Sequence, residues 1–365
     1  MKKKHILPII FCTFITLFMV LTIILPKQER SANEKRVLAK FPEFNWENIS
    51  TGNYMSEFDT YLADHFAFRE KWVGAYSYAT LSLGLNGTTG VYACDDGYLI
   101  TTPAKYSESQ IRRNLGTLKT FAKKNNLDAT LIIVPSTGYI MDDVLPKHHE
   151  EYNDDRLFDL AKDTDIPLID LRDTFKESNE QLYYKTDHHL TSDGALLMYQ
   201  CYTNFKGYKP NEFNVTTTID GFYGTSYSKS GLWKKLPDSI KIYEPVKPYN
   251  FTVTIDKQDF NSLFFKKQLE TEDKYQVFLD GNHALTRIIN NSIDSDKRLL
   301  IIKDSFAHCF TTFLATDYKE IFMVDPRYYR GSLKDLVLDN NLNEVLFLYG
   351  ADNLASSTDL GWILF

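Results

Sequence analysis

The sequence lacks closely spaced cysteine pairs, an excess of basic residues and any internal repeat or low-complexity tract. Its 365 residues include four cysteines, none in a CxxC pair, which argues against a zinc ribbon or a thioredoxin-like redox site. The formal net charge is −7, so the chain has no basic footprint for nucleic acid. What remains is an ordinary globular composition, with 43% hydrophobic and 24% charged residues.

The cysteines also bound the redox chemistry of the chain. Cys12 lies inside an apolar N-terminal run, so Cys94, Cys201 and Cys309 cannot all pair with one another. Free buried thiols are the first expectation, and one disulfide is the alternative. We predict no cofactor and no bound metal.

The N-terminal segment predicts the compartment. A basic start, MKKKH, precedes an uncharged stretch over residues 6–26. At about 1.5 Å per residue this stretch could cross a hydrocarbon core of about 30 Å. No A-x-A-like cleavage site is visible, so we predict a single-pass anchor over residues 1–28 with its tip in the cytoplasm and the rest of the chain extracytoplasmic. A cleaved signal peptide is the alternative, and both export the domain.

Two segments differ in texture from the rest. Aromatic and aliphatic residues recur at helical spacing over 29–90, which predicts a helical leader segment. Residues 206–261 are rich in Gly, Pro, Thr, Lys and Tyr and predict a β-rich insertion. It could be a lid or a glycan-contacting flap, with Tyr227 and Lys229 as candidate contacts, or a structural embellishment.

Residues 91–205 and 262–365 predict one α/β domain. Five short, fully apolar runs alternate with helical segments, at 129–134, 166–171, 298–302, 321–324 and 345–348. Such runs predict a parallel sheet covered on both faces. In these sheets ligands bind beyond the carboxyl ends of the strands, so the residues after each run are where chemistry should be sought.

Two of these places carry reactive residues. In the loop Thr186-Asp187-His188-His189, Asp187 and His189 can turn toward one site, and the carboxylate could orient an imidazole that acts as general base. Ser305, in Lys303-Asp304-Ser305-Phe306-Ala307, stands between a strand and a helix, where backbone N–H groups can stabilise an oxyanion. A serine needs a base, and His189 is the candidate. The alternative is that Asp304 or Ser305 only caps the helix.

Taken together, the motifs resemble the SGNH-hydrolase-like DHHW family, relatives of the AlgX/AlgJ-type O-acetyltransferases. The matching stretches are DHFAFR (64–69), Thr186 to His189, FLDGNH (278–283), KDSFA (303–307) and VDPRYY (324–329). The resemblance covers roughly residues 45–365 in order. Leu190 departs from it, since it stands where the family name has Trp, and this leaves specificity open.

The resemblance implies a three-layer α/β/α SGNH-like fold and a triad of Ser305, His189 and Asp187. The oxyanion hole would use the Ser305 N–H and Asn282 in the Gly281-Asn282 turn, with Asn353 as second candidate, and Arg327 could bind substrate or be a surface arginine. It implies acetyl transfer from a membrane-bound O-acyltransferase partner to a polysaccharide acceptor.

Other readings stay open. Asp187-His188-His189 also spells the DHH of metal-dependent phosphoesterases, although no matching ligand set accompanies it. His308 could be the base, and His148 and His149 fit a solvated loop. His65 and His283 belong to matching motifs but have no predicted chemical role. The same triad would serve an acetyl-ester hydrolase, and a non-catalytic glycan-binding or scaffold subunit of an export complex is the alternative from another class.

Overall fold

The computed structural model describes residues 5–365 and divides the chain into two compact units. The smaller comprises the chain up to residue 89 together with 227–234, and the larger comprises 90–226 and 235–365. The domain limits expected from the sequence remain predictions, and each unit is described by itself.

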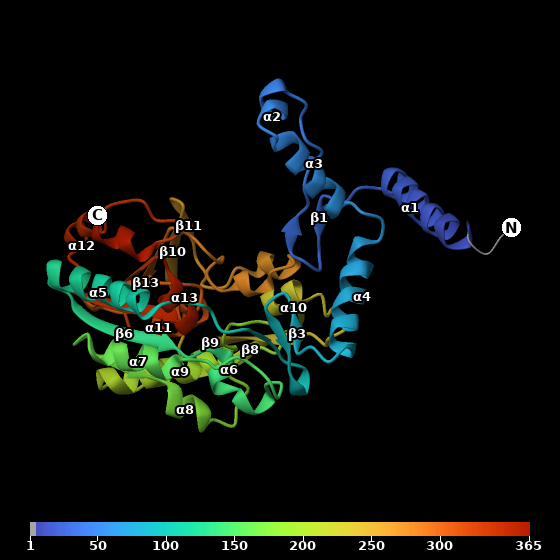
Figure 1. Cartoon of the computed structure of the whole chain (residues 1–365). Helices are drawn as coiled ribbons and strands as arrows, with labels where there is room; N and C mark the ends of the chain where they lie inside the picture. The colour runs from blue at the N-terminus through green and yellow to red at the C-terminus, as the bar shows by residue number, and fades with distance from the viewer. Residues whose placement is uncertain (1–4) are drawn as a thin grey trace. The chain divides into compact units, whose positions relative to one another are not determined.

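An eight-stranded sheet forms the centre of the larger unit (Figure 1). In spatial order its strands are β11 (Gln258–Phe260), β10 (Phe251–Ile255), β12 (Leu285–Asn290), β14 (Glu320–Val324), β13 (Arg298–Lys303), β15 (Glu344–Gly350), β6 (Asp128–Val134) and β7 (Leu168–Asp170). The five strands from β14 to β7 run parallel, and they are the five apolar runs of the sequence. β12, β10 and β11 continue the sheet in antiparallel fashion.

Helices cover both faces of this sheet, because successive residues of its buried strands point to opposite sides. In β13, Leu299 and Ile301 pack into one core cluster, whereas Leu300 and Ile302 pack into the other. The first face carries α8 (Arg172–Lys176), α9 (Ser192–Lys206) and α11 (Ala307–Leu314). The second carries α5 (Glu108–Lys124), α7 (Asp154–Lys162), α12 (Leu333–Asp339) and α13 (Ala351–Ser356). The expected three-layer α/β/α fold is therefore confirmed.

Further elements complete the larger unit. They are β4 (Val91–Ala93), β5 (Leu99–Thr101), α6 (Thr137–Ile140) and the antiparallel pair β8 (Phe213–Phe222) and β9 (Asp238–Pro245). Within the expected insertion at 206–261, β8 and β9 stand apart from the central sheet, whereas β10 and β11 extend it. All four cysteines are free thiols. Cys94 and Cys309 are buried, as first expected, whereas Cys201 is half-buried and Cys12 is exposed.

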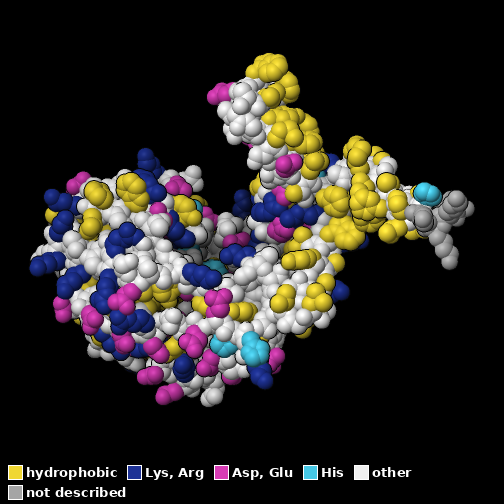
Figure 2. Space-filling model, viewed as in Figure 1, with side chains coloured by type: hydrophobic (Ala, Val, Ile, Leu, Met, Phe, Trp, Pro, Cys, Tyr) yellow, Lys and Arg dark blue, Asp and Glu magenta, His cyan; other side chains and the backbone are white. Residues whose placement is uncertain are grey.

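The smaller unit is mostly helical. It contains α1 (Ile6–Ile24), α2 (Trp46–Ser50), α3 (Asn53–Asp64) and α4 (Arg69–Ser82), with the short strands β1 (Arg30–Ser31), β2 (Arg36–Val37) and β3 (Gly87–Thr88). α10 (Thr225–Ser230) begins in the larger unit and ends in this one. α1 is long and apolar enough to cross a membrane, a test that a signal sequence also passes. On the face shown in Figure 2, hydrophobic side chains cover α1.

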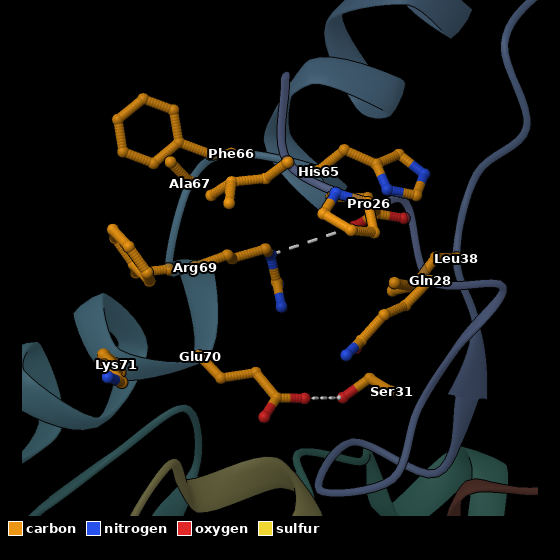
Figure 3. Close-up of a pocket in the computed structure, with 13 residues that line it drawn as sticks. Pro26, Gln28, Ser31, Leu38, His65, Phe66, Ala67, Arg69, Glu70 and Lys71 are labelled. Atoms are coloured by element: carbon orange, nitrogen blue, oxygen red, sulfur yellow. Dashed lines mark hydrogen bonds and ion pairs between the residues drawn. The ribbon is translucent and has the colours of Figure 1, made fainter. Parts of the chain in front are cut away.

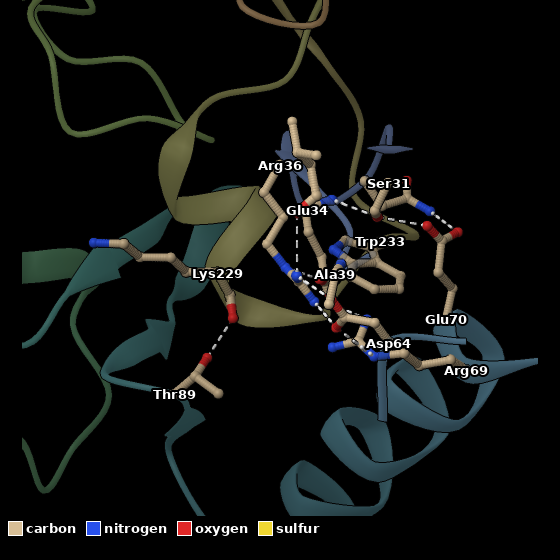
Figure 4. A network of polar contacts seen from close by, with 12 residues as sticks. Ser31, Glu34, Arg36, Ala39, Asp64, Arg69, Glu70, Thr89, Lys229 and Trp233 are labelled. Atoms are coloured by element: carbon tan, nitrogen blue, oxygen red, sulfur yellow. Dashed lines mark hydrogen bonds and ion pairs between the residues drawn. The ribbon is translucent and has the colours of Figure 1, made fainter. Parts of the chain in front are cut away.

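A network of charged groups centred on Asp64 ties the smaller unit together (Figure 4). The Asp64 carboxylate accepts two hydrogen bonds from the Arg36 guanidinium, at 2.8 and 2.5 Å, and one from the Ala39 N–H at 2.8 Å. Glu34 bridges Arg36 and Arg69, at 2.7 and 2.5 Å. This network fixes the end of α3 and the start of α4 against the chain that follows α1.

Candidate active site

Ser305 lies where the central strand β13 passes into α11. The strand ends at Lys303 and the helix begins at Ala307, so Ser305 stands in a tight turn at the carboxyl edge of the sheet. Its side chain is half-buried, and its Oγ lies 2.7 Å from Nε2 of His189. The structure thus brings together two residues that are 116 positions apart in the sequence.

His189 and Asp187 stand in the loop before α9, whose first turn is capped by Thr191. One oxygen of the Asp187 carboxylate, Oδ1, lies 2.5 Å from His189 Nδ1 and accepts the His189 backbone N–H at 2.9 Å. Burial raises the pKa of Asp187, but the His189 and His188 imidazoles and hydrogen bonds outweigh burial and hold the pKa well below its ordinary value. Asp187 is therefore an anion that can orient His189 and stabilise its protonated form.

The loop that carries Asp187 is held by the strand β9. The Asp238 carboxylate accepts hydrogen bonds from the Lys185 N–H at 2.9 Å, the Thr186 N–H at 2.8 Å and the Thr186 hydroxyl at 2.6 Å. The second Asp187 oxygen accepts the N–H of Thr225 at 2.6 Å. Next to it, a Cβ at Gly224 would overlap Asp187, so this close approach requires glycine.

Aromatic rings enclose the imidazole of His189. Tyr275 stacks on it with ring centroids 4.1 Å apart and an angle of 13° between the planes. His188 and Phe306 contact the same imidazole, at 4.0 and 5.3 Å between centroids. Such packing restricts rotation of the ring and keeps Nε2 directed at Ser305.

Asp304 braces the turn that presents the serine. Its buried carboxylate accepts the N–H of Phe306 at 3.0 Å, the N–H of Gly350 at 2.8 Å and the side-chain amide of Asn353 at 2.7 Å. Burial raises the pKa of Asp304, and the three hydrogen bonds oppose that shift. Asn353, one of the two expected oxyanion donors, thus donates one N–H of its side-chain amide to Asp304.

The other expected oxyanion donor, Asn282, follows three residues in the left-handed region. The φ angles of Leu279, Asp280 and Gly281 are 55°, 60° and 77°, a run that costs energy at the two non-glycine positions. The Asn282 side chain is exposed, and its Oδ1 accepts an N–H of Arg327 at 3.2 Å. Arg327 is also bound to Asp325 at 2.6 and 2.8 Å, so this expected substrate ligand belongs to a side-chain network.

That network continues beneath the serine turn. The buried Lys303 ammonium lies 2.8 Å from His308 Nε2 and 3.2 Å from the Asp325 carboxylate. Burial and the neighbouring Lys303 charge lower the pKa of His308 well below its ordinary value. His308 is therefore neutral and accepts a hydrogen bond from Lys303, while Ser305 faces His189.

His65 and His283 have structural partners, whereas His148 and His149 lie at the surface. His65 lies 2.8 Å from the Ala39 carbonyl, in the smaller unit, and His283 lies 3.0 Å from the Asp280 carbonyl. His148 and His149 are exposed, as a solvated loop would have them. Tyr227 donates to the Trp233 carbonyl, within the smaller unit.

A metal at the DHH sequence would compete with existing hydrogen bonds. Asp187, His188 and His189 bring their ligand atoms within 4.8 Å of one another, close enough to hold an ion. Both Asp187 oxygens, however, accept protein N–H groups, and both His189 ring nitrogens face Asp187 or Ser305. An ion here would have to break the contact between the imidazole and the serine or the carboxylate.

Comparison with known proteins adds family matches to this geometry. Residues 170–324 match the DHHW protein family, and residues 96–204 match the SGNH hydrolase-like domain of acetyltransferase AlgX. The expected resemblance is confirmed. No curated protein sequence matches the chain.

Solved structures share the DHHW-like fold. A DHHW family protein from Eubacterium siraeum is 22% identical, covers 76% of this chain and 97% of its own, and has a TM-score of 0.66. PatB1 of Bacillus cereus is 22% identical over 72% of this chain and 96% of its own, with a TM-score of 0.60. The O-acetyltransferase domain of Pseudomonas putida AlgJ is 15% identical over 75% and 97%, with a TM-score of 0.50. At these identities the likeness establishes the fold.

The structure adds residues that sequence reasoning missed. Tyr275, Asp238 and Gly224 lie outside every matched motif, and they act through contacts across the fold that no local pattern announces. Asp304 belongs to a matched motif, but its sequence position predicts only a possible helix cap.

Proposed function

We propose that the chain is an extracytoplasmic O-acetyltransferase that acetylates a cell-surface polysaccharide through Ser305, His189 and Asp187. The observation that carries this proposal is the continuous line from Asp187 to His189 Nδ1 and from His189 Nε2 to Ser305 Oγ, at 2.5 and 2.7 Å. This arrangement activates a serine that is otherwise a poor nucleophile. The AlgX-type domain and the fold shared with PatB1 and AlgJ support acyl transfer as the chemistry.

The reaction has two half-steps. Ser305 Oγ attacks the acetyl carbonyl carbon of the donor while its proton passes to His189 Nε2, and the tetrahedral intermediate then expels the donor group, which takes that proton. In the second half-step a sugar hydroxyl gives its proton to His189 Nε2 and attacks the acetyl carbonyl carbon of the acetyl-serine. The tetrahedral intermediate expels Ser305 Oγ, which takes that proton back from His189, so both residues are restored. The Ser305 N–H, Asn282 and Asn353 are the proposed stabilisers of the oxyanion, and Arg327 the proposed substrate ligand.

The proposal also assigns a place and partners. α1 would hold the protein in the cell membrane with the larger unit outside, and a membrane-bound O-acyltransferase would supply the acetyl group. The structure of AlgJ covers an O-acetyltransferase domain, which supports the transferase over the hydrolase.

Covalent labelling tests the chemistry. The detergent-solubilised full chain is incubated with 4-nitrophenyl acetate, and intact-mass and peptide mass spectrometry locate the adduct. We expect one acetyl group on Ser305, absent from Ser305→Ala and His189→Ala but present in the matched controls Ser356→Ala and His149→Ala, which change exposed residues elsewhere. Equal labelling of all five proteins would overturn the triad.

Adding acceptors separates transferase from esterase. Acetylated protein is mixed with candidate oligosaccharides, and acetylated sugar and free acetate are quantified. Transfer to sugar faster than release of acetate supports the transferase. Acetate release that no oligosaccharide changes supports the hydrolase. PatB1 has been solved with a sulfonyl adduct, so a sulfonyl fluoride offers a second label for Ser305.

A further inference from the structure

In the smaller unit, α1 and the corner between α3 and α4 form one continuous apolar surface. The ring of Phe18 stacks on Phe66 with centroids 5.7 Å apart. Trp72 meets Phe18 and Phe14 edge-on, at 5.5 and 6.4 Å. Thr22 is the buried residue of α1, and it lies beneath the same corner.

These contacts are made well inside the span of α1. With a rise of about 1.5 Å per residue, the 19 residues of α1 measure about 28 Å, close to the hydrocarbon thickness of a bilayer. Phe18 and Phe14 precede the last residue, Ile24, by about 9 and 15 Å. When α1 spans a bilayer, the side chains of Phe66 and Trp72 that touch them lie below the lipid headgroups.

Several polar groups of the corner are paired within the protein, which lowers the cost of placing them in an environment without water. The Trp72 indole N–H donates to the Ala67 carbonyl at 3.1 Å, and the Ala67 N–H donates to the Thr22 hydroxyl at 3.0 Å. The Phe66 carbonyl accepts the N–H of Arg69 at 2.9 Å. A segment that entered lipid with these groups unpaired would be destabilised by each one.

The corner is nevertheless exposed within the chain. The side chains of Phe66, Phe68 and Trp72 are 41%, 46% and 43% exposed, although each is large and apolar. The ammonium of Lys71 lies 5.3 Å from the centre of the Phe68 ring. This is typical of a lysine whose aliphatic stem lies along an apolar surface while its charge points toward water. An apolar group of this size beside a membrane helix fits acyl chains.

Charged groups stand directly behind the corner. Arg69 and Glu70 line a pocket of about 260 Å³ together with Gln28 and Ser31 (Figure 3). Glu70 accepts the Ser31 hydroxyl at 2.6 Å and the Asn33 amide at 2.7 Å. This polar layer follows the apolar one within a few residues, as the headgroup region follows the acyl chains.

We propose that Phe66, Phe68 and Trp72 form a wedge that inserts among the acyl chains of the outer leaflet beside α1. The smaller unit then contacts the bilayer at two points, through the spanning helix α1 and through the wedge. The second contact limits the tilt of this unit relative to the membrane. The inference rests on α1 spanning the membrane, and it is independent of acyl transfer.

Depth-dependent quenching of Trp72 tests the wedge. The chain has four tryptophans, so the triple change Trp46→Phe, Trp233→Phe and Trp362→Phe leaves Trp72 as the only one, and a matched variant retains Trp362 of the larger unit instead. Both full-length proteins are reconstituted into phosphatidylcholine and phosphatidylglycerol vesicles that carry brominated acyl chains. We expect at least a twofold loss of Trp72 emission, and no change for Trp362, which is 53% exposed.

Two results would overturn the wedge, provided that the protein resists carbonate extraction and α1 is therefore inserted. Trp72 that is quenched by aqueous acrylamide and not by bromine lies in water. Trp72 that is shielded from both quenchers is covered by protein, such as a second copy of the chain.

A second reporter guards against a folding defect in the tryptophan variants. Bimane on Phe68→Cys, in a Cys12→Ser and Cys201→Ser background, should shift its emission to the blue in vesicles and be quenched by bromine, unlike bimane on Leu338→Cys in the larger unit. Unshifted, unquenched emission at position 68 in inserted protein contradicts the proposal.

Discussion

Asp187 in the larger unit and Asp64 in the smaller unit are both buried carboxylates at the centre of a hydrogen-bond network, but their partners differ. Asp64 faces the guanidinium of Arg36, and Asp187 faces the imidazole of His189. Hydrogen bonds from Arg36 oppose the effect of burial and lower the pKa of Asp64 to about 2, and the pKa of Asp187 is likewise held below its ordinary value.

The partner decides what each network can do. A guanidinium keeps its charge at every ordinary pH, so the Asp64 pair is static and fixes two elements against each other. An imidazole gains and loses a proton near neutral pH, so the Asp187 pair can take part in proton transfer. The two carboxylates are thus similar in burial and pKa direction, but only the Asp187 pair has a partner suited to the proposed chemistry.

The largest effect should come from removing the charge of Asp187. Asp187→Asn keeps the size of the side chain but loses the anion that stabilises protonated His189, and it can hold the ring in the wrong tautomer. We expect acylation of Ser305 to slow by about 10³- to 10⁴-fold, measured by stopped-flow release of 4-nitrophenolate. A loss below tenfold would mean that the carboxylate has only a packing role.

A smaller effect should follow from crowding that carboxylate without changing its charge. In Gly224→Ala the new methyl group would overlap Asp187, so the carboxylate must move away from His189. We expect acylation to fall by about 10- to 100-fold, because small displacements of catalytic groups have effects of this size. Gly116→Ala, whose added Cβ meets no neighbouring atom, is the matched control and should react like the parent.

The ring that stacks on His189 sharpens the comparison further. Tyr275→Leu removes an aromatic contact worth about 1 kcal/mol, so acylation should slow by about 5- to 10-fold. Tyr275→Phe retains the ring and should stay within about twofold of the parent. The pH–rate profile of acylation distinguishes an effect on His189 from a simple loss of packing. If the Tyr275 ring stabilises protonated His189, its removal shifts the pH midpoint of the acylation rate, whereas a loss of packing alone leaves that midpoint unchanged. Equal rates for the leucine and phenylalanine variants would contradict a role for the stack.

Acylation should change least when the other carboxylate is altered. Asp64→Asn removes one of the two carboxylates that contact Arg36, and Glu34 remains as the other. We expect a loss of about 2 kcal/mol in the free energy of unfolding of the smaller unit with an unchanged acylation rate. Chemical denaturation followed by limited proteolysis of the smaller unit measures the free energy of unfolding. The nitrophenyl ester assay measures the acylation rate. A fall in acylation would show that the two networks are coupled.

The stability difference between the parent and Asp64→Asn should depend on pH with a definite sign. The folded pKa of Asp64, about 2, is below its ordinary value of 3.8, so its contribution to stability is fully present above pH 3.8 and is lost as the pH falls toward 2. The stability gap between the parent and Asp64→Asn should therefore narrow between pH 5 and pH 2. A constant gap over that interval would argue against the ion pair.

Much of the larger unit could be predicted from the sequence because its strands are short and apolar on both faces. All five parallel strands lie where the apolar runs placed them, within a few residues. The antiparallel strands β10 and β12 alternate in exposure, and such a pattern does not show whether a strand extends the main sheet or belongs to a separate insertion.

The candidate site was predictable where motifs are local and unpredictable where the fold supplies the contact. Asp187, His189 and Ser305 stand in short motifs next to strand and helix ends, so they could be named. Tyr275 and Asp238 reach the same site from segments 86 and 49 residues beyond His189, and only the three-dimensional structure reveals them. The Asn282 and Asn353 amides could be named from their motifs, but each has a side-chain partner that no sequence pattern could disclose.

The separation of 116 residues between His189 and Ser305 has a consequence for biosynthesis. Asp304 in the serine turn also binds Gly350 and Asn353, so a nascent polypeptide that ends soon after Ser305 lacks β14, β15 and the hydrogen bonds that hold this turn. The proposed nucleophile is thus positioned only when nearly the whole chain has been synthesised and folded. Labelling of Ser305 would therefore also serve as a gauge of complete folding, because a partly folded chain has a serine but no base beside it.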